Sequence, residues 1–379
     1  MHEVNRILKY PNEWKKVYCR DWCENNEKIW LTLSNKNAIC EIDKNSGKVD
    51  VLGSFPNNEL YEDRLSYSVC KVDNLVIFCP LASKDIAIYD TKEMKLEFIK
   101  IPPVDKYDIQ YREDSKFFNS FAFERNVYFS GLRYPGIIKL NLDSKQICCI
   151  DEWVNRIEKY ACREGVRITE GHAILGKEAI LPLGNCNGVL RINLVSGNCT
   201  YKDMKVFFGG IQGLVQYKNI ICLTGRSNAN NFFLIWDSVT DLIKRVKLPV
   251  QDEFSAPLLL NDTFVILGKK KGRGFVYSIK TEELVEITEH ISEYGRILAA
   301  KQRNGFLYFF AEKGGGLYKF DPMNNSVSCK TIFIEDDIYL EDSWISFCNH
   351  QLKKATTETI DEDVFGVRDY IDFLGQKEQ

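Results

Sequence analysis

Histidine is scarce in this sequence, and long apolar runs are missing. Only four histidines occur among 379 residues, which leaves too few imidazoles in any one region for a histidine-rich metal site. No apolar run approaches the roughly 20 residues that cross a bilayer, and the first ten residues carry charged side chains where a secretory signal is apolar. The formal net charge is −3, so no overall basic field favours nucleic acid or an anionic membrane surface. We expect a cytoplasmic protein with no metal, cofactor, nucleic-acid or membrane partner.

The 13 cysteines form neither a disulfide framework nor a zinc motif. Most of them lie inside apolar, strand-like runs, such as Cys79 in LVIFCP and Cys222 in NIICLTG. Cys19 and Cys23 have C-x3-C spacing, but no second cysteine pair or nearby histidine completes a zinc site. We interpret the cysteines as small buried hydrophobic residues that a reducing cytosol keeps as thiols.

What the chain does contain is a sevenfold internal repeat. Each copy has an apolar run, a polar turn and a second apolar run that ends at an anchor residue, as in KIWLTLSNKNAICEID, followed by a turn and a further short run. Another strand candidate precedes each copy, for example at 17–22 and 296–302. A short Asp or Asn side chain at the anchor can accept hydrogen bonds from the backbone of the following turn. The anchors lie 41 to 52 residues apart, at Asp43, Asp90, Asn141, Asn193, Asp237, Lys280 and Asp321, of which only Lys280 departs from the Asp or Asn pattern.

Four strands per unit with a period near 45 residues are typical of a propeller blade. The repeat therefore predicts an all-β protein, a seven-bladed β-propeller of four-stranded antiparallel blades. From about residue 14 to 350 the chain resembles the β-propeller superfamily, especially its kelch-like and quinoprotein-like bacterial members. The Trp-Asp pair of known propeller repeats occurs once, at Trp236-Asp237, and the Gly-Gly pair of kelch repeats, found at Gly209-Gly210, does not recur from blade to blade. The resemblance therefore implies the fold and no specific family or bound quinone.

One segment interrupts the repeat, and two others follow its seventh copy. Residues 151–167 carry apolar side chains at helical spacing, which predicts a short helix. Residues 339–347 (YLEDSWISF) echo 61–69, which predicts an additional innermost strand that either closes the ring or begins a partial eighth blade. We assign residues 1–350 to the propeller and 351–379 to a tail. Val364, Val367, Ile371 and Leu374 predict an amphipathic tail helix that docks on its own propeller or forms a homodimer or partner contact.

In a propeller the innermost strands line a central channel, and the connectors that lead into them form the face where ligands usually bind. We call this the mouth face. Its connectors are rich in charge and aromatic rings, which fits stacking on a polar ligand and binding of its carboxylate or phosphate groups, although polar turns with internally paired charges have the same composition. We expect the following residues at the mouth of the channel: Tyr61, Arg64, Tyr67, Phe118, Asn119, Arg167, Glu170, His172, Gln212, Tyr294, Arg296 and Trp344.

The sequence leaves two functions open. The first is a non-enzymatic propeller that binds a partner protein or a polar small ligand at the mouth face. The alternative is an enzyme, such as a hydrolase, lyase or cyclising enzyme on a sugar or peptide, in which Arg167, Glu170, His172 and Arg296 act. We favour the first, because no nucleophile motif accompanies His172 and a hydrogen-bonded channel histidine explains it better than a catalytic one.

Overall fold

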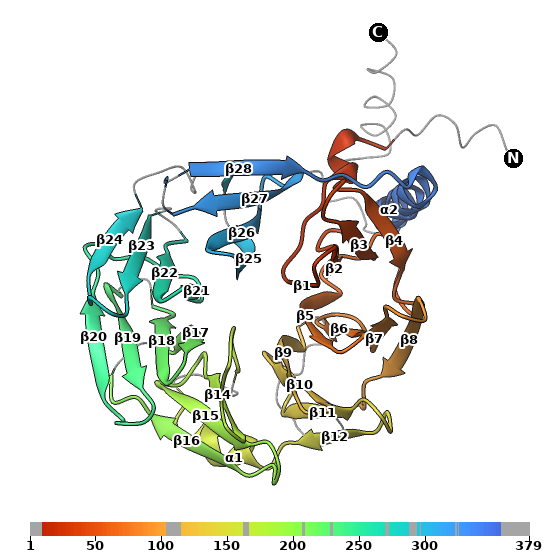
Figure 1. Cartoon of the computed structure of the whole chain (residues 1–379). Helices are drawn as coiled ribbons and strands as arrows, with labels where there is room; N and C mark the ends of the chain where they lie inside the picture. The colour runs from red at the N-terminus through yellow and green to blue at the C-terminus, as the bar shows by residue number, and fades with distance from the viewer. Residues whose placement is uncertain are drawn as a thin grey trace, which may run out of the picture.

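The computed structural model shows seven four-stranded antiparallel sheets arranged radially about one axis, which confirms the predicted propeller (Figure 1). Each blade is built from four consecutive strands, with the first strand innermost. The structure describes residues 10–103, 115–161, 167–206, 209–227, 230–269, 273–287, 294–295, 297–322, 324 and 326–357.

The blades follow one another in chain order. Blade 1 comprises β1 (Trp22–Glu24), β2 (Lys28–Thr32), β3 (Ile39–Asp43) and β4 (Val49–Gly53), and blade 2 comprises β5 (Ser66–Val72), β6 (Leu75–Pro80), β7 (Asp85–Asp90) and β8 (Lys95–Lys100). Blade 3 comprises β9 (Phe117–Phe123), β10 (Asn126–Gly131), β11 (Ile137–Asn141) and β12 (Ile147–Ile150), and blade 4 comprises β13 (Ala173–Leu175), β14 (Glu178–Pro182), β15 (Gly188–Asn193) and β16 (Cys199–Asp203). Blade 5 comprises β17 (Ile211–Tyr217), β18 (Ile220–Gly225), β19 (Phe232–Asp237) and β20 (Ile243–Lys247). Blade 6 comprises β21 (Leu258–Leu260), β22 (Thr263–Leu267), β23 (Gly274–Ser278) and β24 (Leu284–Ile287). Blade 7 comprises β25 (Ile297–Arg303), β26 (Phe306–Ala311), β27 (Gly316–Asp321) and β28 (Ser326–Thr331).

The apolar runs of the repeat form the second and third strands of each blade. In blade 4, Ile180 and Leu181 of β14 point to opposite faces, and both are fully buried because neighbouring blades cover both sides of the sheet. In the outermost strands, such as β8, exposed side chains alternate with half-buried ones over most of the strand. Cys19, Cys79 and Cys222 lie in this packed interior, and burial raises the pKa of each thiol.

The anchor residues close each blade's outer turn, as the sequence indicated. Asp43 Oδ1 accepts a hydrogen bond from the backbone nitrogen of Ser46 at 2.7 Å, and the other Asp and Asn anchors accept bonds in the same way. In blade 6 the anchor is Ser278, whose Oγ accepts from the nitrogen of Thr281 at 3.2 Å. The assignment of Lys280 as the anchor was therefore wrong. The anchor lies two residues earlier in the chain, where a serine hydroxyl accepts the hydrogen bond that a carboxylate or amide oxygen accepts in the other blades.

The ring closes without exchange of strands between its ends, because the first and last blades each contain only consecutive strands. A short segment after β28 pairs with the N-terminal region, through a bridge from Phe333 to Lys16 and another from Ile334 to Val49. Lys330 also donates to the carbonyl oxygen of Lys44 at 2.7 Å. The seam between blades 7 and 1 is therefore held by side chains and isolated bridges.

The innermost strand predicted at 339–347 was wrong, and with it the partial eighth blade: these residues belong to helix α2 (Asp337–Thr357). Along α2, buried or half-buried side chains recur at the three- and four-residue spacing of one helix face, at Leu340, Ser343, Trp344, Phe347 and Cys348. That face packs on Trp14, whose indole nitrogen donates to Ser343 Oγ at 2.8 Å and whose ring lies 5.2 Å from that of Trp344.

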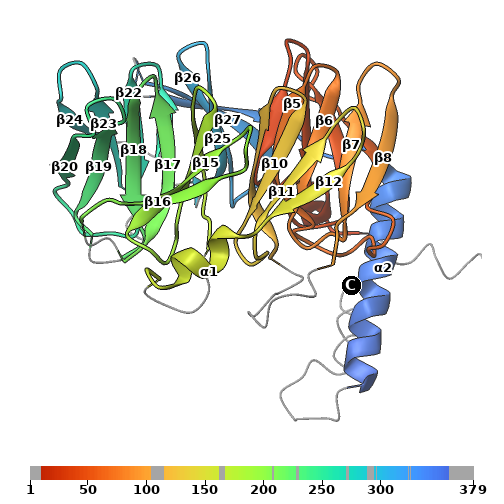
Figure 2. The same ribbon diagram turned by 90° about the horizontal axis from the view of Figure 1, so that it is seen from below.

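The predicted short helix is confirmed as α1 (Trp153–Glu158), which lies on the same side of the ring as α2 (Figure 2). Helix α2 runs through residue 350, where we had placed the end of the propeller. The tail helix predicted from Val364 to Leu374 lies outside the described residues. Among the described helices, neither has the length and apolar character needed to cross a membrane.

Lys36 lies fully buried beneath Trp14, where its ammonium donates to the Trp14 carbonyl oxygen and sits 4.8 Å from the ring centre. Burial lowers the pKa of Lys36 from 10.5 to about 8, since no described carboxylate pairs with it. The folded pKa is thus below the unfolded one, so the charged form costs stability below pH 8. That cost disappears as the pH rises from 8 to 10.5.

We expect Lys36→Met to raise the free energy of unfolding by about 1–2 kcal/mol at pH 7, because it removes a buried charge while leaving the Trp14 carbonyl without its donor. Urea unfolding at pH 7 and pH 10 measures this, and the advantage of the variant should shrink at pH 10. Lys48→Met, at a position where the side chain is 58% exposed, is the control and should change little at either pH. An unchanged or lower free energy of unfolding of Lys36→Met at pH 7 would refute the conclusion that the buried charge of Lys36 costs stability.

Candidate functional site: the central cavity

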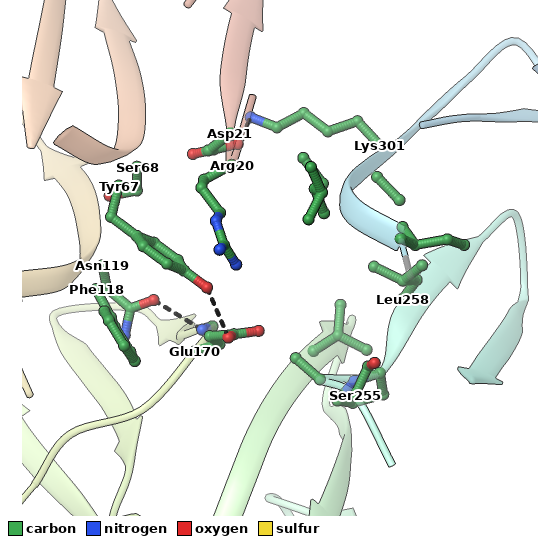
Figure 3. Close-up of a pocket in the computed structure, with 18 of the residues that line it drawn as sticks. Arg20, Asp21, Tyr67, Ser68, Phe118, Asn119, Glu170, Ser255, Leu258 and Lys301 are labelled. Carbon is green, nitrogen blue, oxygen red and sulfur yellow. Dashed lines mark hydrogen bonds and ion pairs between the residues drawn. The ribbon is translucent and has the colours of Figure 1, made fainter. Parts of the chain in front are cut away.

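The channel contains a cavity of about 340 Å³ bounded by the innermost strands and the connectors that precede them. Its size is at the lower end of the range for small-molecule sites. Polar and aromatic side chains from blades 1 to 4 form one wall, and mostly apolar side chains from blades 5 to 7 form the other (Figure 3). The cavity is lined by Arg20, Asp21, Tyr67, Ser68, Phe118, Asn119, Ser120, Glu170, Gly171, His172, Leu214, Val215, Ser255, Ala256, Pro257, Leu258, Leu267, Lys269, Ile297, Leu298, Ala299, Ala300 and Lys301.

An aromatic shelf of Tyr67 and Phe118 forms part of the polar wall. The two rings stack with centres 4.4 Å apart and planes at 25°, although they come from neighbouring blades. The Tyr67 hydroxyl donates to Glu170 Oε1 at 2.8 Å, which fixes that carboxylate beside the shelf. The shelf presents ring faces and a carboxylate to the same space (Figure 3).

The connector that carries Glu170 is held in place by Asn119 and by Gly171. Asn119 Oδ1 accepts from the nitrogen of Gly171 at 2.7 Å, and its amide donates to the carbonyl of Thr169. Gly171 has φ +87°, and a Cβ there would stand 2.0 Å from the carbonyl oxygen of Leu214. Only glycine allows the connector to approach β17 this closely.

Two of the three lining cations are paired with carboxylates. Lys301 Nζ lies 2.8 Å from Asp21 Oδ1, and Lys269 Nζ lies 2.9 Å from Glu253 Oε1. Burial alone lowers the pKa of Lys301, but attraction and hydrogen bonding by Asp21 outweigh it, so the pKa is raised. Lys301 is therefore charged at neutral pH, and each of the two lysines has a carboxylate as its ion-pair partner.

Arg20 is the third lining cation and differs from the other two. Its Nε atom is buried and has no hydrogen-bond partner among the described residues, and no described carboxylate forms an ion pair with it. The guanidinium carbon lies 5.9 Å from the centre of the Tyr67 ring. The guanidinium points into the cavity (Figure 3), so its donors face the space that a ligand would occupy.

His172 lines the same cavity with its ring stacked on Phe121 at 4.8 Å. Burial, and to a lesser extent the positive charge of Lys301, lowers the pKa of His172 to about 4. The imidazole is therefore neutral at pH 7 and adds no positive charge to the site.

The structure brings together part of the predicted mouth. Tyr67, Phe118, Asn119, Glu170 and His172 line the central cavity. Six of the remaining predicted residues lie elsewhere. Tyr61 and Arg64 line a second cavity beneath α2, and Trp344 lies on α2 against Trp14. Tyr294 packs in the core of blades 6 and 7, Gln212 is buried in β17, Arg167 lies on the connector before β13, and the seventh, Arg296, is outside the described residues.

The second cavity measures about 420 Å³ and lies between α2 and the connector before β5. Tyr61 and His350 line it, with their rings stacked at 4.3 Å and the tyrosine hydroxyl 2.8 Å from His350 Nδ1. Arg64 also lines it and is paired with its neighbour Asp63. These residues therefore belong to the junction of α2 with the ring, away from the channel.

Sequence reasoning missed Arg20, Asp21 and Lys301, which provide most of the charge in the central cavity. All three lie inside the strand candidates 17–22 and 296–302, where charged side chains interrupt apolar ones. Choosing charged residues within the innermost strands, as well as in the connectors, would have found them.

Comparison with known proteins supports the fold. No protein-family model matches the sequence, and no curated protein matches it. Among solved structures, the chain is similar to a streptogramin B lyase, with 13% identity, a TM-score of 0.61, and coverage of 85% of this chain and 96% of that one. The protein is a β-propeller. Virginiamycin B lyase from Staphylococcus aureus (14% identity, TM-score 0.60, 81% and 95% covered) and BamB from Moraxella catarrhalis (10%, 0.55, 83% and 89%) are also similar to this propeller. At these identities the likeness establishes architecture alone.

Proposed function

We propose that this propeller binds a small ligand with an anionic group in its central cavity and does not transform it. The observation that carries the proposal is the guanidinium of Arg20, which is partly buried, aimed into the cavity and without a described partner. A guanidinium that points into a cavity and has no carboxylate partner can bind a carboxylate or phosphate group of a ligand through charge-assisted hydrogen bonds.

The remaining charges of the cavity support the choice of Arg20 as the anion site. Lys269 and Lys301 already hold carboxylates, and His172 is neutral. We favour a small ligand over a partner protein because the Arg20 guanidinium points into the central cavity and not toward the outer rim of the propeller. The Tyr67 and Phe118 shelf supplies the stacking surface that a planar or apolar part of the ligand needs.

A screen of small carboxylates and phosphate monoesters by ligand-observed NMR tests this proposal, with neutral amides of the same carbon skeletons as controls. The best binder is then titrated against Arg20→Leu and against Arg64→Leu, an exposed arginine outside the channel. We expect affinity about tenfold lower in Arg20→Leu and nearly unchanged in Arg64→Leu. No binder in the set, or equal affinity in Arg20→Leu, would refute the proposal.

An enzyme is the second candidate, because His172 and Glu170 line one cavity and a neutral imidazole can accept a proton. Prolonged incubation of the best binder with the protein separates the two functions. Recovery of the ligand unchanged supports binding, and conversion that is lost in His172→Gln supports catalysis.

A further inference from the structure

We propose that the ligand is a zwitterion, with a cationic group beside its anionic one, of the class of free α-amino acids with apolar side chains. This inference rests on the proposed function for the anion, which Arg20 binds. It adds Glu170 as the residue that binds the cation.

Glu170 has bonding capacity left over. Its Oε1 accepts the hydrogen bond from Tyr67, while its Oε2 has no partner among the described residues. A carboxylate can accept several hydrogen bonds, and an ammonium group has three donors to offer. Figure 3 shows the guanidinium of Arg20 and the carboxylate of Glu170 directed into the same space, and no ion pair joins them.

The charge balance of the cavity favours a ligand without net charge. Asp21 neutralises Lys301, Glu253 neutralises Lys269, and His172 is uncharged. Among the described residues that line the cavity, Arg20 and Glu170 remain as opposite charges without an ion-pair partner. A simple anion bound to Arg20 would stand near the like charge of Glu170, at a cost that a low-dielectric cavity increases. A zwitterion satisfies both residues and keeps the site neutral.

The walls indicate what else the ligand carries. The hydroxyl of Tyr67 holds Glu170 beside the stacked rings of Tyr67 and Phe118, and an aromatic ring face attracts an ammonium group. The opposite wall is formed by Leu214, Val215, Leu258 and Ile297, which can cover an apolar side chain. A cavity of about 340 Å³ is large enough for a free amino acid and too small for a long peptide.

Calorimetric titration with three matched sets of probes tests the proposal. Each set contains a free amino acid (L-valine, L-leucine or L-phenylalanine), its N-acetyl derivative, which lacks the cation, and its amide, which lacks the anion. We expect at least one free amino acid to bind, with both of its derivatives about tenfold weaker. In Glu170→Gln the free amino acid should lose about tenfold in affinity, while the N-acetyl derivative binds as well as before or better.

The outcomes distinguish this inference from the proposed function. If Arg20→Leu weakens binding of N-acetyl probes and Glu170→Gln changes nothing, the anion site stands and the zwitterion is refuted. Equal binding of free and N-acetylated amino acids, or no binding of any free amino acid, refutes it as well. Tyr67→Phe keeps the aromatic ring and removes only the hydroxyl that holds Glu170. The midpoints of thermal unfolding of all variants establish that each propeller has folded.

Discussion

Replacing Gly171 by alanine is expected to lower the free energy of unfolding by about 3 kcal/mol. The new Cβ would stand 2.0 Å from the carbonyl oxygen of Leu214, and the residue has φ +87°, which side chains rarely adopt. Relief requires the connector to move away from β17. Glu170 and His172 would move with it, so ligand affinity should fall together with stability.

Gly176 provides the matched control, because it lies on the other side of β13 in the same blade. It also has a positive φ, of +60°, but a Cβ there meets nothing within 4 Å. Gly176→Ala should therefore cost only about 1 kcal/mol, the price of the backbone conformation alone. Chemical unfolding of both variants measures the difference, and equal losses would show that the contact with Leu214 has no energetic weight.

Asp21→Ala is expected to have a similar effect of about 3 kcal/mol, because Asp21 links three blades. Its carboxylate accepts from the nitrogens of Trp22 at 2.9 Å and Val69 at 2.8 Å, in blades 1 and 2, and pairs with Lys301 of blade 7. The substitution removes two backbone hydrogen bonds and leaves Lys301 without its carboxylate partner, with the Trp22 carbonyl as its remaining acceptor. The loss should appear as a lower midpoint of thermal unfolding.

Two further variants separate the contributions at this position. Asp21→Asn keeps an acceptor for the backbone nitrogens and removes only the charge, so its loss should be about half as large. Asp50→Ala breaks a salt bridge in which both side chains are about half exposed, and it should change stability by less than about 0.5 kcal/mol. A loss in Asp21→Ala no larger than in Asp50→Ala would contradict the role of Asp21 at the seam.

The number of blades and their strand order were predictable because the repeat is local. Each pair of central strands is joined by a short turn, and its apolar periodicity and Asp or Asn anchor all lie within some 20 consecutive residues, as from Lys28 to Ser46. The departure at Lys280 was a shift of two residues within a correct hairpin. A serine can bond the turn backbone as an Asp does, only more weakly, so the anchor was harder to recognise.

The site was predictable only in part, since its decisive contacts join distant residues. Asp21 of blade 1 accepts a hydrogen bond from Val69 of blade 2 and pairs with Lys301 of blade 7. No sequence pattern near Asp21 predicts either partner. Helix α2 was mistaken for a strand because YLEDSWISF repeats the residue types of true innermost strands. Its helical spacing emerges only when Leu340, Ser343 and Phe347 are considered as a face against Trp14.

The self-contained blades at both ends of the chain give this ring a weak point under tension. Many closed rings lock by lending a strand from one terminus to the sheet of the other; here each terminal sheet is complete by itself. Pulling on the two ends would therefore first separate α2 from Trp14 and then part the first and last sheets without unravelling either, after which the opened ring would extend sheet by sheet. A single-molecule stretching trace should begin with a small, reversible step before the larger ruptures.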